Sequence, residues 1–145
     1  MPSPETAVSL VEVTVSVLTR RAGSGAGAAA MAAAARRAYD DLSAVLAPLI
    51  SQVGVDALVA RALHVTRRDY PSDQAAEEEA TEPFAQVTLW LEQQDPTLAT
   101  DAAAAMFATF AALLAALIGE PLTTRYLRKA WPDSFSDTRA EGTQA

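Results

Sequence analysis

Three small residues near the start of the chain match a pattern that binds dinucleotides. Gly23, Gly25 and Ala28 form a GxGxxA motif downstream of the alternating segment VEVTVSV. In a βαβ unit, such a turn brings a pyrophosphate to the start of a helix. Here, residues 19–21 separate the valines from the first glycine, and no second strand follows. We therefore interpret the glycines as a flexible linker rather than a nucleotide site.

The only histidine, His64, stands between two arginines at helical spacing. Arg61 precedes it by three residues and Arg68 follows it by four, which places the three side chains on one helix face. Such a stripe can contact an anion or the carboxylates of a partner, and a solvated helix face is the alternative. No acidic residue lies three or four positions from His64, which argues against a metal site.

The other groups that could do chemistry assemble no catalytic set. Glu77, Glu78 and Glu79 lie in an acidic connector over residues 71–83, which lacks the spaced oxygen ligands of an EF-hand loop. The chain has no cysteine, and no serine stands in a GxSxG motif. We therefore expect no enzyme activity, no cofactor and no metal.

Composition favours a single helical domain. The chain has 145 residues, of which 50% are hydrophobic and only 6% aromatic, and alanine is the commonest type. Its net charge of −7 argues against a nucleic-acid partner. Residues 1–20 do not show the charge pattern of a secretory signal, so we expect a cytoplasmic protein.

Apolar periodicity predicts an all-α bundle of about five helices in a domain over residues 28–131. The expected helices cover residues 28–47, 55–69, 82–94, 100–118 and 121–131. Pro48 and Gly54 separate the first two helices. Asp95 and Pro96 end the third, and Asp101 stands at the start of the fourth.

Flexible segments are expected on both sides of this domain, a leader over residues 1–27 and a disordered tail over residues 132–145. Within the leader, alternating valines over residues 11–17 suit a strand. A lone strand would have to pair with another chain. The same segment also has apolar residues at helical spacing, and we favour a short helix or disorder over the strand.

The helix expected over residues 100–118 is apolar nearly all round, so it must lie centrally or at an oligomer interface. A membrane span is the less favoured alternative, because its uncharged run is just short of the roughly 18–20 residues that cross a bilayer. The candidate interface residues lie on this helix and the next: Met106, Phe107, Phe110, Leu114, Leu117, Leu122, Tyr126 and Trp131.

Together these patterns favour a non-catalytic helical interaction or regulatory module. Its partner is another protein or a second copy of the chain, because the long apolar helix is hard to cover with the other helices alone. The alternative is a sensor that binds a small molecule between helices. The wall of its pocket would consist of four aromatic side chains: Trp90, Phe107, Phe110 and Tyr126.

Overall fold

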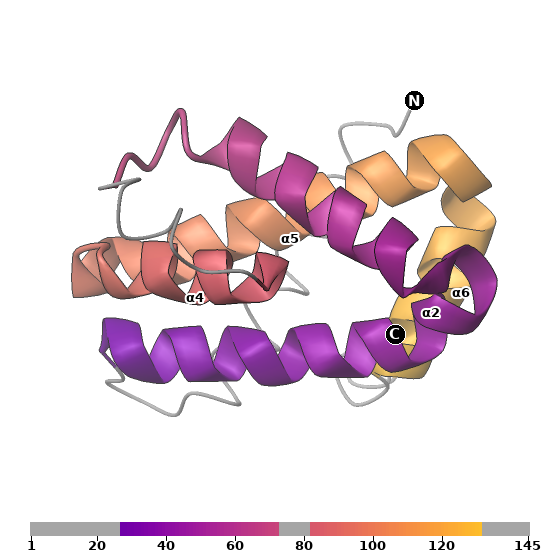
Figure 1. The fold of residues 1–145 in the computed structure, drawn as a ribbon, viewed down its shortest axis with the longest axis horizontal. Coiled ribbons are helices and arrows are strands. Elements are labelled where there is room, and N and C mark those ends of the chain that lie inside the picture. The colour runs from indigo at the N-terminus through magenta and orange to yellow at the C-terminus, as the bar shows by residue number, and fades with distance from the viewer. Residues whose placement is uncertain (1–26, 73–81, 132–145) are drawn as a thin grey trace, which may run out of the picture.

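The computed structural model describes residues 27–72 and 82–131, where four helices pack together and no strand occurs (Figure 1). The all-α prediction is confirmed. The count differs from the expected five because the first two helices form one bent element. The valine segment, Gly23 and Gly25, residues 73–81 of the acidic connector and the tail lie outside the described residues.

The first element, α2 (Ala28–Thr66), folds back on itself at Ser51 (Figure 1). We call residues 28–50 its first arm and residues 52–66 its second arm. Pro48 lies inside the helix, where it removes a backbone donor. The break occurs three residues later at Ser51, whose φ of 69° and ψ of 160° are not helical. The side-chain oxygen of Ser51 accepts a hydrogen bond from the Gly54 N–H at 3.2 Å, so Ser51 caps the second arm.

The next two helices, α4 (Pro83–Glu92) and α5 (Pro96–Ile118), are separated by a short turn. Asp95, which we expected to end the earlier helix, instead caps the start of α5, because its carboxylate accepts from the Thr97 N–H at 3.1 Å. Proline at the first position of α5 needs no donor there. Asp101 is therefore a full turn inside α5, and our placement of it at the start was wrong.

The last helix, α6 (Glu120–Ala130), follows α5 after a single residue, Gly119. Gly119 has a φ of 92°, which is strained for any residue with a Cβ atom. Its N–H donates to the Ala115 carbonyl at 2.8 Å, and its own carbonyl accepts from the Thr123 N–H at 3.1 Å. One glycine therefore ends α5 and turns the chain into α6.

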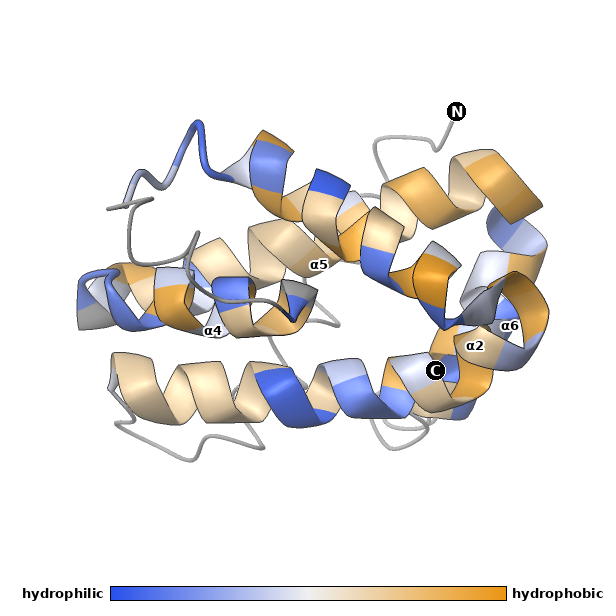
Figure 2. Ribbon diagram, in the orientation of Figure 1, coloured by the Kyte–Doolittle hydropathy of each residue, from blue (hydrophilic) through white to orange (hydrophobic). Residues whose placement is uncertain are grey.

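The core contains a row of aromatic rings that joins all four helices. Tyr39 of α2 stacks on Phe84 of α4, with ring centres 4.4 Å apart. Phe84 then meets Phe107 of α5 at 6.3 Å, and Phe107 meets Trp131 edge-on at 5.7 Å. The indole N–H of Trp131, at the end of α6, donates to the Ala38 carbonyl of α2 at 3.2 Å. Apolar colours run along α5, which, like α2, contacts each of the other helices (Figure 2).

Arg36 covers the outer edge of this row. Its guanidinium carbon lies 5.9 Å from the ring centre of Tyr39 and 5.7 Å from that of Phe84. The same group pairs with Glu82 at 2.6 Å and with Asp40 at 3.3 Å. Since Glu82 is the N-cap residue of α4, the ion pair ties the start of α4 to the first arm of α2.

Trp131 is a direct test of this core. Replacing it with alanine removes a 3% exposed ring that joins α6 to α2 and α5. We expect Trp131→Ala to lower the free energy of unfolding by about 3–5 kcal/mol in urea denaturation. The control Leu98→Ala, at a side chain that is 45% exposed, should lower it by less than about 1 kcal/mol. Equal losses in the two variants would contradict the placement of Trp131.

Candidate functional site

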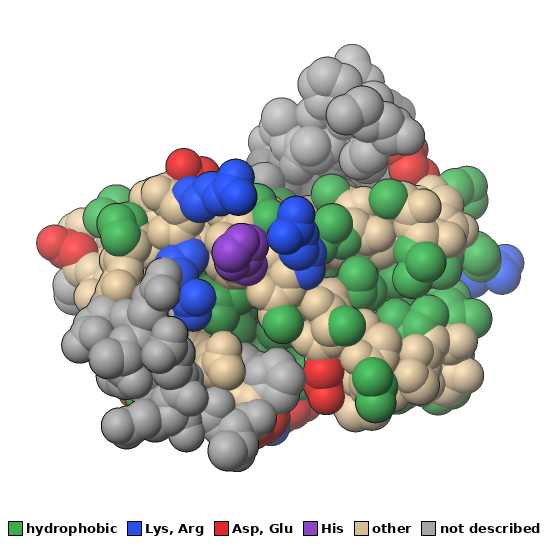
Figure 3. Space-filling model, turned by 45° about the horizontal axis from the view of Figure 1, so that its top comes forward, with side chains coloured by type: hydrophobic (Ala, Val, Ile, Leu, Met, Phe, Trp, Pro, Cys, Tyr) green, Lys and Arg blue, Asp and Glu red, His purple; other side chains and the backbone are tan. Residues whose placement is uncertain are grey.

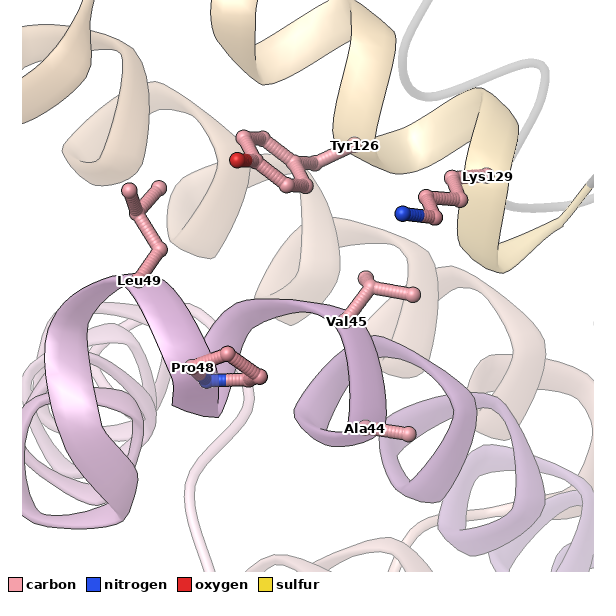
Figure 4. Close-up of a pocket in the computed structure, with 6 residues that line it drawn as sticks. All are labelled: Ala44, Val45, Pro48, Leu49, Tyr126 and Lys129. Atoms are coloured by element: carbon pink, nitrogen blue, oxygen red, sulfur yellow. The ribbon is translucent and has the colours of Figure 1, made fainter.

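An open groove lies between the bend of α2 and helix α6 (Figure 4). Its volume is about 280 Å³. Four residues of the first arm and two of α6 line it: Ala44, Val45, Pro48, Leu49, Tyr126 and Lys129. The ring of Tyr126 faces Leu49, and the amine of Lys129 points into the groove (Figure 4). The groove is therefore apolar on the α2 side, with one cation at its rim.

Large apolar side chains are exposed at the bend of α2 and where α5 passes into α6. Leu49 is 43% exposed and Val53 is 78% exposed, on the two sides of the bend. Leu117, in the last turn of α5, is 62% exposed, and Leu122, at the start of α6, is 40% exposed. We call these four residues the bend end. In Figure 3, hydrophobic side chains gather at the right, the side on which α2 bends in Figure 1.

A fifth large apolar side chain, Leu98, is 45% exposed but lies elsewhere. It is in the first turn of α5, whereas Leu117 is in the last turn. At a rise of 1.5 Å per residue, the two leucines are about 28 Å apart along the helix. Leu98 is therefore an isolated exposed leucine, of the kind that a single-domain surface normally carries.

The bend end also lies in the part of the chain with the fewest acidic residues. Asp56 is the only charged residue over residues 42–60, and residues 102–118 carry no charge. Helix α6 adds Glu120 and a group of three cations near its end: Arg125, Arg128 and Lys129. The net charge of −7 is therefore carried mostly elsewhere, and it opposes contacts at this end less than at other surfaces.

The structure divides the eight candidate interface residues into two groups. Five are at most 3% exposed and belong to the core: Met106, Phe107, Phe110, Leu114 and Trp131. Leu117 and Leu122 are exposed, and Tyr126 is half-buried in the wall of the groove. A partner of the folded bundle therefore meets these last three and not the buried five. Leu49 and Val53 were not among the predicted interface residues, because the first expected helix ended at residue 47 and the second began at residue 55.

Three of the four aromatic residues expected to form the wall of a sensor pocket do not line a pocket in the described structure. Trp90, Phe107 and Phe110 are 0%, 3% and 1% exposed, and they fill the core. The indole N–H of Trp90 also donates to the Tyr70 carbonyl at 2.7 Å, which anchors the end of α2 to α4. Tyr126 alone of the four lines the groove.

Two residues of the basic stripe, Arg61 and His64, lie on the second arm of α2, and Arg68 lies in the turn that follows it. All three are exposed. Figure 3 shows the histidine among Lys and Arg side chains on one face of the molecule. Helical spacing therefore applies to Arg61 and His64 but not to Arg68, and contact with an anion or a partner's carboxylates stays a prediction.

A polar cluster connects the two arms of α2. Tyr39 of the first arm donates its hydroxyl hydrogen to an Asp56 carboxylate oxygen at 2.7 Å. The Gln52 amide donates to the Tyr39 oxygen at 3.1 Å and to the same Asp56 oxygen at 2.9 Å. Ser43 in turn donates to the Gln52 amide oxygen at 2.8 Å. We call these four residues the clasp, because every link but one spans the bend.

The clasp does not have the properties of a catalytic group. Burial raises the pKa of the Tyr39 hydroxyl, and the hydrogen bond to Asp56 and the charge of that carboxylate raise it further. A phenol that holds its proton so firmly is a poor base or nucleophile at neutral pH. Within residues 27–72 and 82–131, no three His, Cys, Asp or Glu side chains come together as a metal site.

Comparisons with protein-family models, with curated proteins and with solved structures find no match to this chain. By length and composition alone, α2 and residues Thr97–Ile118 of α5 could each cross a membrane. The core helix of a soluble protein passes the same test. The bend at Ser51 interrupts α2, and 44% of the apolar window of α5 is buried inside the bundle.

The clasp predicts a specific loss of stability in alkaline solution. The unfolded chain begins to lose the Tyr39 proton near pH 10, whereas the raised pKa keeps the proton on the folded chain. The stabilisation by Tyr39 is therefore complete below pH 10 and is lost as the pH rises further. Tyr39→Phe should cost about 1–2 kcal/mol at pH 7, and its free energy of unfolding should fall less steeply above pH 10.

The matched control is Tyr126→Phe, in the groove wall. Its free energy of unfolding should fall above pH 10 as steeply as that of the unmodified protein. Urea denaturation followed by circular dichroism at pH 7 to 11 would measure both slopes. If the free energy of unfolding falls equally steeply with pH in Tyr39→Phe and in the unmodified protein, the clasp does not hold the phenol as described.

Proposed function

We propose that this chain is a non-catalytic helical interaction or regulatory module that associates with a second copy of itself through the bend end. One observation carries the proposal. Of the five large apolar side chains that are most exposed in the described residues, four lie on the segments where α2 bends and α5 passes into α6. Isolated exposed leucines are ordinary, but a cluster beside an apolar groove marks a contact surface.

The expected strength of this contact follows from the exposed area. Complete burial of a Leu or Val side chain contributes about 1.5–3 kcal/mol, so each partly exposed side chain of the bend end contributes about 1 kcal/mol. Two copies bury about eight such side chains, which gives roughly 8 kcal/mol before the cost of association. The dissociation constant of the dimer is therefore expected to lie above the micromolar range.

Charge supports a second copy as the partner. Copies of an acidic protein repel one another over most of their surfaces. The segments that carry the bend end also carry charges of both signs, with Asp56 after the bend and Glu120, Arg125 and Lys129 on α6, so acidic and basic groups of two copies can face each other there. The contact surface is thus apolar in the middle and mixed in charge at its edge, as protein interfaces are.

A small-molecule sensor is less well supported than this module. Its expected aromatic wall is buried, and the groove volume of about 280 Å³ is below the usual 300–1,000 Å³ of ligand pockets. An open groove of this size suits a side chain of a protein partner better than an enclosed ligand.

One negative charge introduced at each end of α5 tests the surface. Leu117→Glu places a carboxylate in the bend end and should leave the protein monomeric, because a charge cannot be buried there without a partner. Leu98→Glu, on a leucine of similar type at the other end, should leave association unchanged. Sedimentation equilibrium from micromolar to millimolar protein measures the mass of each variant.

The unmodified protein should show a mass that rises with concentration towards that of a dimer. A monomer at every concentration contradicts self-association. Equal weakening by Leu117→Glu and Leu98→Glu contradicts the bend end as its surface.

A further inference from the structure

The bend of α2 depends on one strained residue. Ser51 is the only non-glycine residue with a positive φ in the described part of the chain, at φ 69° and ψ 160°. That region of backbone space is occupied almost entirely by glycine, because a Cβ atom collides with the neighbouring peptide. The bent form therefore carries a local cost that a straight helix at Ser51 would not have.

A change at Ser51 alone would make α2 continuous. The residues on both sides of it are already helical, and Ser51 is the residue inside α2 whose backbone angles are not helical. Pro48 does not prevent this, since proline kinks a helix without necessarily ending it. The bent and straight forms of α2 thus differ mainly in the two backbone angles of Ser51.

The contacts that keep α2 bent join residues before Ser51 to residues after it. In the clasp, Tyr39 and Ser43 come from the first arm, and Gln52 and Asp56 from the second. Straightening α2 in a single molecule would break these bonds and expose the core face of the first arm. If two molecules straighten together, each first arm can make the same contacts with the other molecule.

The apolar pattern across the bend fits the straight form. Val45, Leu49 and Val53 are spaced at four-residue intervals, so a continuous helix would place them in one stripe. In the bent form this stripe is interrupted, and Val53 is 78% exposed. Two straight α2 helices related by a two-fold axis would bring their stripes together and cover Leu49 and Val53.

We propose that two copies of this chain form a dimer by exchanging the first arm of α2, with Ser51 as the hinge. The partner is a second copy because only that copy offers a second arm, α4 and α5 of matching shape. A short strained hinge favours such exchange, because the strain is relieved when the hinge straightens. This inference rests on the proposed self-association and specifies how it occurs.

Two substitutions at the hinge should shift the dimer in opposite directions. Ser51→Gly relieves the strain of the bent monomer and loses little capping, so the dimer should weaken roughly tenfold per hinge and about a hundredfold for two hinges. Ser51→Ala keeps the strain and loses the hydrogen bond to the Gly54 N–H, so the dimer should tighten. Equal dissociation constants for Ser51→Gly and Ser51→Ala would overturn arm exchange.

A cross-linking experiment distinguishes arm exchange from surface association. The chain has no cysteine, so the double variant Ser43→Cys, Gln52→Cys carries only the two introduced thiols. The native side chains meet across the bend at 2.8 Å, which suits a short thiol-reactive cross-linker. The cross-linker is applied to the separated dimer fraction, and the products are resolved on a denaturing gel.

Arm exchange predicts a covalent dimer from the double variant and none from Ser43→Cys or Gln52→Cys alone. A covalent link within one chain, in a fraction of dimer mass, overturns arm exchange and leaves self-association intact. A covalent dimer from either single variant also overturns it, because that link does not need the exchanged pair. Monomer mass at every concentration overturns both proposals.

Discussion

The bend of α2 at Ser51 places both arms of a 39-residue helix in one bundle with α4, α5 and α6. The rest of the fold depends on this constraint. The first arm supplies Tyr39 to the aromatic row and the Ala38 carbonyl to Trp131, while the second arm supplies Asp56 to the clasp. A straight α2 in an isolated molecule could not make both sets of contacts. Ser51 therefore bears a local strain that contacts elsewhere in the bundle offset.

The same constraint creates the candidate interaction surface. Where α2 turns and α5 passes into α6, no other described helix covers the apolar side chains, and Leu49, Val53 and Leu117 stay exposed. An alanine-rich helix such as α5 can be packed closely by its neighbours, so its own core face needs no second copy. The proposed surface for association therefore lies at the end of the bundle rather than along α5.

Local pattern was sufficient to predict most of the helices and much of the core. In the helix expected over residues 82–94, Phe84, Val87 and Trp90 recur at three-residue intervals, and the structure buries them with exposures of at most 1%. The helix expected over residues 100–118 ends where α5 ends, because Gly119 follows and glycine readily takes a positive φ. These features depend on residues close together in the chain, and periodicity reports such features directly.

The bend and the interface residues depend on distant contacts, which periodicity does not report. Proline pointed to a break at Pro48, but the clasp between Tyr39 and Asp56, 17 residues apart, accompanies a turn at Ser51. Periodicity likewise showed that Phe107 and Phe110 share an apolar face, but not that other helices of the same chain cover it. Asp95 was misassigned because an Asp–Pro pair both ends one helix and begins the next.

The central claim, that self-association takes place at the bend end, is tested most directly by hydrogen–deuterium exchange at low and high protein concentration. Residues that enter the contact become protected as the dimer forms, and the change is located along the chain. We predict added protection at high concentration over residues 44–57 and 115–126, with little change in α4. Added protection centred on α4 or on the basic stripe, or no change at all, would contradict the account.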